Sequence, residues 1–125
     1  MRHTALAEGT RDEILGELEQ YGSDRAQQGE TEKARAYAQA LHAVRAGAVE
    51  VRVEHAVYRI IGEHRPDSYV TSSGSRDSVL VRLKGLCEFH AASDRRPELE
   101  DAVSAVEHGG LEVFVDGTLY RVVED

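Results

Sequence analysis

Cys87 and His90 form the one Cys/His pair in this sequence at a spacing typical of metal ligands. On a helix, positions i and i+3 share a face, so both side chains can reach one metal ion. A structural zinc takes four ligands, and His42 or His108 would have to be recruited from elsewhere. A half-buried thiol beside a surface histidine is the commoner situation, so we predict no metal and no cofactor.

A serine-rich segment, Ser72–Arg76 (SSGSR), leads into a predicted helix. Free backbone N–H groups at a helix start, with hydroxyls and a guanidinium, suit an anion. The candidate anion-binding residues are Gly74, Ser75 and Arg76. Simple helix capping is the alternative. The lysine and the spacing of a Walker loop are absent.

The order helix, helix, hairpin resembles a winged helix, which offers DNA binding as an alternative function. The second predicted helix would then read DNA with Lys33, Arg35, Gln39 and Arg45. The corresponding helix near the C-terminus is acidic, and a winged helix normally has a third helix. DNA binding is therefore confined to the first part of the chain.

Charge and composition narrow the function further. The 15 basic and 23 acidic residues give a net charge of −8. Such a charge makes nucleic acid an unfavoured partner, because affinity for phosphates comes mainly from Lys and Arg. No Ser/His/Asp order or carboxylate pair stands out, so we expect no enzyme. A single cysteine, no signal-like apolar run and no membrane-span length predict a cytoplasmic protein without a membrane partner.

The elements that must position these residues show an internal repeat. Residues 41–63 align with residues 103–125 at an offset of 62, and Tyr58-Arg59 meets Tyr120-Arg121. The preceding helices align at an offset of 65, where Gly9-Thr10-Arg11-Asp12 meets Gly74-Ser75-Arg76-Asp77. An internal duplication predicts a pseudo-symmetric fold.

Helix signals recur in both copies. Thr10 and Glu13 form a capping box, and Ser75 caps the third helix. Gly22-Ser23 is a candidate end for the first helix, with Ser23–Glu30 either a loop or a helical extension. Met1–Gly9 is expected to be a loose arm.

Two hairpins follow the helix pairs. The Asp116-Gly117 turn aligns Glu112 with Arg121 and Phe114 with Leu119. The same arithmetic aligns Glu50 with Arg59 in the first hairpin. Its Glu54-His55 turn predicts a looser loop, because neither residue adopts a positive φ cheaply.

The fold class is therefore α+β, with two tandem ααββ (helix-helix-β-hairpin) repeats related by pseudo-two-fold symmetry. One compact domain, residues 1–125, would contain repeats at about 10–62 and 75–125, joined by a linker at 63–74. Within this linker, Tyr69-Val70-Thr71 is a candidate short strand or docking segment.

An apolar outer face on the second hairpin suggests the function. A solvated strand face should be polar, so cover is needed from the first hairpin or from a partner. We predict a non-enzymatic, acidic protein-interaction or regulatory module that binds a protein or self-associates as a homodimer. The expected interface residues are Phe114, Leu119, Val123, Val57 and Ile61.

Overall fold

The computed structural model describes residues 5–63, 67–115 and 117–123, which form a mixed α+β fold with four helices and one six-stranded sheet. In chain order the elements are β1 (Ala5–Gly9), α1 (Arg11–Gln27), α2 (Thr31–Arg45), β2 (Ala48–Val53), β3 (Ala56–Ile60), β4 (Val70–Gly74), α3 (Arg76–Phe89), α4 (Arg96–Glu107), β5 (Gly110–Val115) and β6 (Thr118–Val122).

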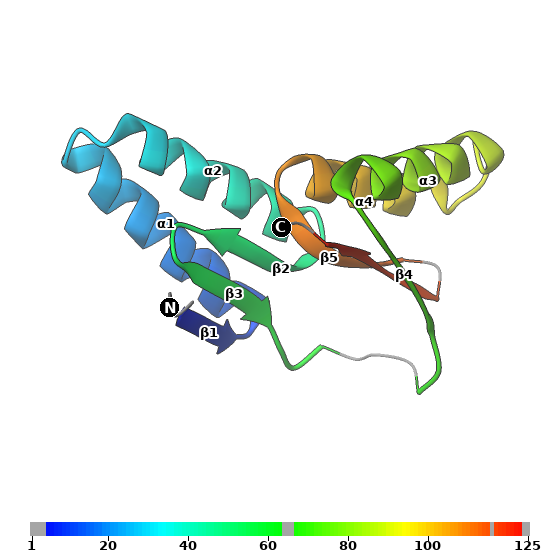
Figure 1. The fold of residues 1–125 in the computed structure, drawn as a ribbon, viewed down its shortest axis with the longest axis horizontal. Helices are drawn as coiled ribbons and strands as arrows, with labels where there is room; N and C mark the ends of the chain where they lie inside the picture. The colour runs from blue at the N-terminus through cyan, green and yellow to red at the C-terminus, as the bar shows by residue number, and fades with distance from the viewer. Residues whose placement is uncertain (1–4, 64–66, 116, 124–125) are drawn as a thin grey trace.

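The sheet has the order β1-β3-β2-β5-β6-β4, and the helices form a second layer. In Figure 1, α1 and α2 accompany β2 and β3, whereas α3 and α4 accompany β4 and β5. Strand alternation turns the buried valines of β2 and β5 toward this layer. The other side of the sheet, here called the open face, is covered by no helix that the structure describes.

One strand, β1, was not expected from the sequence, and β4 was expected only as a short strand or docking segment at residues 69–71. The segment expected as a loose arm contains β1, and the segment expected as a linker contains β4. β1 pairs parallel with β3, and β4 pairs parallel with β6. Both are edge strands, and neither has the alternating pattern that makes a strand recognisable. Each helix pair is therefore preceded by a strand, and an ααββ description omits it.

α1 runs through Gly22-Ser23 and ends at Gln27, so the residues after Ser23 extend the helix to Gln27 instead of forming a loop. The glycine is there for packing, because a Cβ at Gly22 would lie 3.1 Å from Cβ of Tyr37 on α2. α1 and α2 thus approach closely at this point, and the glycine is not a helix stop.

The predicted caps are confirmed. Thr10 and Glu13 form the complete capping box of α1, and Ser75 accepts from the backbone N–H of Ser78 at the start of α3. Gly47 and Gly109 follow α2 and α4 with φ of 114° and 99°, where other residues are strained.

Both hairpins have the predicted register. Glu50 pairs with Arg59, and Glu112 pairs with Arg121. The expectation of a looser first turn is wrong, because Val53 pairs directly with Ala56. Glu54 adopts a φ of 56°, and its carboxylate accepts hydrogen bonds from Arg25 and Tyr37. Those bonds offset the strain of the left-handed backbone.

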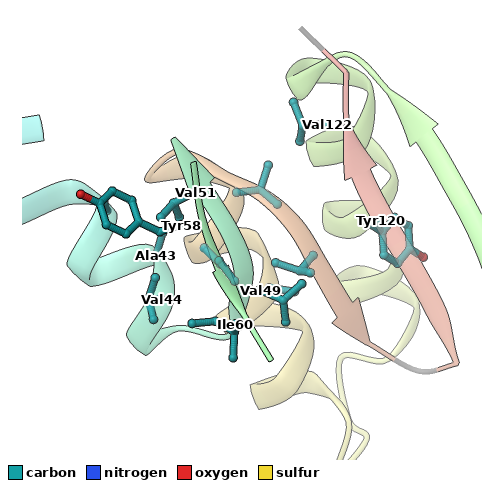
Figure 2. Close-up of a cluster of buried hydrophobic side chains, with 14 of the residues drawn as sticks. Ala43, Val44, Val49, Val51, Tyr58, Ile60, Tyr120 and Val122 are labelled. Carbon is teal, nitrogen blue, oxygen red and sulfur yellow. The ribbon is translucent and has the colours of Figure 1, made fainter. Parts of the chain in front are cut away.

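The core lies between the sheet and the helices. Its labelled members in Figure 2 come from α2, β2, β3 and β6, including Tyr58 and Tyr120. On the helices, Ile14 and Leu18 of α1 and Val79 and Leu83 of α3 are completely buried. No helix among the described residues has the length and apolar character to cross a membrane.

Candidate binding site on the open sheet face

One transverse row of polar side chains crosses all six strands of the open face. Each member is the registered neighbour of the next, so the row follows from strand pairing alone. In sheet order the central row is Glu8, Arg59, Glu50, Glu112, Arg121 and Ser73.

Two carboxylates face each other at the middle of this row. Glu50 pairs with Glu112 across the β2–β5 junction, and both residues are more than nine-tenths buried. Register shifts on each side of the pair mark a local irregularity of the ladder. Like charges in direct opposition repel, so each carboxylate needs a nearby cation.

Arginines on the neighbouring strands supply these cations. The ion pair is tighter in the β2–β3 hairpin than in the β5–β6 hairpin. Arg59 donates two hydrogen bonds to Glu50, the shorter 2.7 Å long, and the interaction raises the pKa of Arg59. Arg121 lies 4.0 Å from Glu112, at the limit of an ion pair. Arg121 therefore has more freedom to bind something else.

A hollow of about 420 Å³ opens at the end of β3, and we call it the acidic hollow. Two carboxylates, one guanidinium and two large apolar side chains characterise its lining: Glu8, Glu63, Arg59, Ile61 and Phe114. Glu63 is paired with Arg11 at 2.7 Å.

A hollow of about 610 Å³ opens at the end of β6, and we call it the arginine hollow. Three guanidiniums, one carboxylate, one hydroxyl and an apolar side chain characterise its lining: Arg52, Arg76, Arg121, Glu50, Ser73 and Val123. Positive charge therefore outweighs negative charge in this lining.

The expected interface residues lie on the open face but do not form one patch. Ile61 and Phe114 line the acidic hollow, whereas Val57 lies beside Leu6 and Arg52. Leu119 is buried, with 6% of its surface exposed. Phe114 stacks edge-to-face on Tyr69, their ring centres 5.5 Å apart. Val123 lines the other hollow, so the apolar surface is divided between two sites.

The expected anion-binding residues have other bonding partners. Ser75 caps α3, and the carbonyl of Gly74 accepts from the N–H of Val123. Arg76 donates to the carbonyls of Val106 and Gly110, at 2.6 and 3.0 Å, which ties α4 to β5. Arg76 nevertheless lines the arginine hollow.

The candidate DNA-reading residues lie on the exposed side of α2. Arg35 and Gln39 are exposed, but Lys33 is within 4.0 Å of Glu30 and Glu54. Arg45 borders a small hollow that also contains Glu98 and Asp101 of α4. Negative charge beside these cations weakens attraction for a phosphate backbone.

The Cys/His pair remains two separate side chains at the end of α3. Burial raises the pKa of the Cys87 thiol, with a further contribution from Glu100, so its thiolate is disfavoured. His90 forms the C-cap of α3 and contacts Phe89. Among the described residues, no three histidine, cysteine or acidic side chains are placed to hold a metal.

The two other candidate ligands, His42 and His108, stack on each other with ring centres 3.8 Å apart. His42 Nε2 lies 2.9 Å from Ser104 Oγ, and His108 Nδ1 donates to the Ser104 carbonyl. The group ties α2 to α4 at the centre of the helical layer. Parallel rings direct their lone pairs side by side, which does not suit shared metal binding.

The sequence interpretation did not identify Arg52 and Arg121 as members of one site. The hairpin registers place each arginine on the outer face, and that much could be read from the sequence. Their convergence depends on the antiparallel β2–β5 pairing, which no local signal specifies.

Comparison with known proteins adds no relative: no family model matches the chain, and neither the curated proteins nor the solved structures give a significant match.

Proposed function

We propose that this protein is a non-enzymatic interaction module that self-associates through the open face of its sheet. The observation that carries the proposal is the uncovered face itself. It presents the half-exposed apolar side chains Leu6, Ile61 and Val123, with 53%, 45% and 57% of their surfaces accessible. Burying apolar area of this kind contributes about 25 cal/mol per Å².

Charge complementarity favours a second copy as the occupant. The acidic hollow and the arginine hollow lie on the same face and differ in the sign of their excess charge. A two-fold axis can place each acidic hollow against the arginine hollow of the other copy, so one favourable contact forms twice. A chain of net charge −8 needs such local pairing to approach itself.

We also propose that the chain is a duplicated βααββ unit, with residues 5–61 and 70–123 as its halves within one domain. Support comes from hydrogen bonds at matching positions. Arg11 donates to the carbonyls of Val44 and Ala48, as Arg76 does to those of Val106 and Gly110.

The junction between the halves supports the same proposal. Ala48 pairs with Val113, and Val51 pairs with Gly110, so the partners exchange at the offset of 62 seen in the sequence. Glu50 and Glu112 then lie where a pseudo-two-fold axis would pass. Self-complementary pairing of this kind is what two-fold symmetry requires.

The DNA-binding alternative has weaker support. Its cations on α2 have carboxylates for neighbours, and the open face is remote from them in the layer order. No observation in the described part of the chain favours an enzyme over an interaction module.

Light scattering after size exclusion, over a range of protein concentrations, tests self-association. We expect a dimer that dissociates on dilution, and dissociates more readily at high salt because the charged contacts are screened. Ile61→Glu should give a folded monomer. Val81→Glu is the matched control, because Val81 is 70% exposed but lies on α3.

A wild-type monomer at the highest soluble concentration would contradict the proposal. Equal loss of dimer in both variants would also contradict it, because the open face would then have no special role. Circular dichroism on the same samples shows whether each variant is folded.

A further inference from the structure

We infer that the arginine hollow binds a small dianion, of the phosphate or dicarboxylate class. This goes beyond the proposed function, because the hollow belongs to a single chain and needs no second copy. The inference rests on three guanidiniums that reach one hollow from three different elements, β2, α3 and β6.

The three arginines differ in how far they are already used. Arg52 is exposed and makes no hydrogen bond or ion pair with any residue that the structure describes. Arg121 is half exposed and only loosely paired, 4.0 Å from Glu112. Arg76 is fixed by two backbone carbonyls and contributes its charge from a set position.

A planar guanidinium binds phosphate or carboxylate through two parallel hydrogen bonds, so the exposed Arg52 and the loosely paired Arg121 together suit a dianion. Ser73 adds a hydroxyl to the same lining. Glu50 also lines the hollow and would repel an anion, but it accepts two hydrogen bonds from Arg59. Its charge is therefore largely balanced from the neighbouring strand.

The acidic hollow supplies an internal comparison. It has one arginine, Arg59, which is bonded to Glu50, and it has Glu8 and Glu63 in its lining. The same kind of depression at the end of a hairpin strand thus lacks a free guanidinium. Anion binding should be restricted to one end of the sheet.

Isothermal titration calorimetry with sodium phosphate, at constant ionic strength, tests the inference, and a parallel titration with malonate separates the two ligand classes. We expect one saturable site. Arg52→Gln should weaken binding at least about tenfold, as expected for loss of a hydrogen bond to a charged group. Arg121→Gln should weaken it as well. Arg45→Gln is the control, because it removes the same charge from the helical layer and should leave the affinity unchanged.

The monomeric variant Ile61→Glu keeps this test separate from self-association. Its change lies in the acidic hollow and leaves the arginine hollow intact. Because no partner then covers the arginine hollow, the variant should bind the anion at least as tightly as the wild type. NMR titration gives a second measurement, in which the amides of Gly109 and Val123 shift and that of Gly62 does not. No saturable heat with either anion, or equal affinity in wild type and Arg52→Gln, would overturn the inference.

Discussion

The two hollows of the open face have corresponding places in the sheet and opposite chemistry. Under the proposed duplication, Arg52 in the arginine hollow occupies the position that corresponds to Phe114, which lines the acidic hollow. Ser73 likewise corresponds to Glu8. These two exchanges remove one carboxylate and add one guanidinium, and they account for part of the difference between the acidic and the basic lining.

This difference shows which positions the fold constrains. Arg59 and Arg121 keep their type in both hairpins, because each lies next to a buried glutamate on the adjoining strand. Positions that contact only solvent or a ligand are free to diverge. The two halves therefore share a frame, meaning the residues that hold the sheet and helices together, and differ in the residues that line the two hollows.

The largest effect that tests the shared frame is in the core. Leu18 and Leu83 are both completely buried at corresponding positions of α1 and α3. Replacing either by alanine should lower the free energy of unfolding by about 2–5 kcal/mol, the range for buried Leu→Ala changes. Urea denaturation measures both. A negligible loss for one of them would break the equivalence of the halves.

The next effect concerns the arginines that tie the helices to the sheet. Arg11→Met and Arg76→Met each remove two hydrogen bonds to backbone carbonyls. The expected loss is roughly 1.5–3 kcal/mol, as for hydrogen bonds to charged groups. Arg35→Met, on the exposed side of α2, is the control. If either variant is as stable as the control, the bonds are not needed and the correspondence is incidental.

A pair of glycines sharpens the difference between the halves. A Cβ at Gly110 would lie 2.7 Å from the carbonyl oxygen of Ala105, although the corresponding residue is Ala48. Gly110→Ala should therefore cost about 1–3 kcal/mol, as overpacking does. Gly85→Ala, where the added Cβ meets nothing within 4 Å, should stabilise the protein by about 0.5–1 kcal/mol. Thermal denaturation measures whether each variant is less or more stable than the wild type. If Gly110→Ala did not lower the stability, the packing around Gly110 would have adjusted to the added methyl group.

The smallest effect is a pH dependence confined to the first half. Hydrogen bonds from Arg25 and Tyr37 hold the pKa of Glu54 below its usual range. Burial, together with the hydrogen bond to Glu54, raises the pKa of Tyr37. A lowered carboxyl pKa stabilises the fold above the unfolded value, near 4.3, and this contribution is lost as pH falls through the folded value. It should amount to no more than about 1 kcal/mol, because the pair is near the surface.

Denaturation of wild type and Glu54→Gln between pH 3 and 7 measures this term, with roughly equal stabilities at the acid end as the expected result. Tyr37 corresponds to Leu99 in the second half, which has no hydroxyl to donate. A stability gap that widened toward acid pH would contradict the assignment.

Much of the frame could be predicted from the sequence because its signals are local. The helix caps at Thr10 and Ser75 each depend on a few neighbouring residues. The register of the second hairpin is equally local, although Asp116 of its predicted Asp-Gly turn lies outside the described residues. The edge strand β1 was not predicted, and β4 was offered only as a short strand or docking segment at residues 69–71, because Val70–Gly74 becomes a full strand only by pairing with β6. The arginine hollow was missed for the same reason: Arg52 and Arg121 converge through pairing between strands that are far apart in the chain.

The strand order has a consequence for the newly made chain. Every pairing in the sheet except β2–β5 joins strands of the same half, so none of the pairings within the first half needs a strand of the second. The β2 edge of the first half stays unpaired until β5 has been synthesised, which requires the 55 residues from Ile61 to Val115. At about 5–20 residues per second, the synthesis of these residues takes roughly 3–11 s.

During that interval the β2 edge is an unpaired template for another strand. The junction has self-complementary register, so the best available partner is β2 of a neighbouring nascent chain. Crowded polysomes should therefore favour mispaired first halves, and slow synthesis should favour them more.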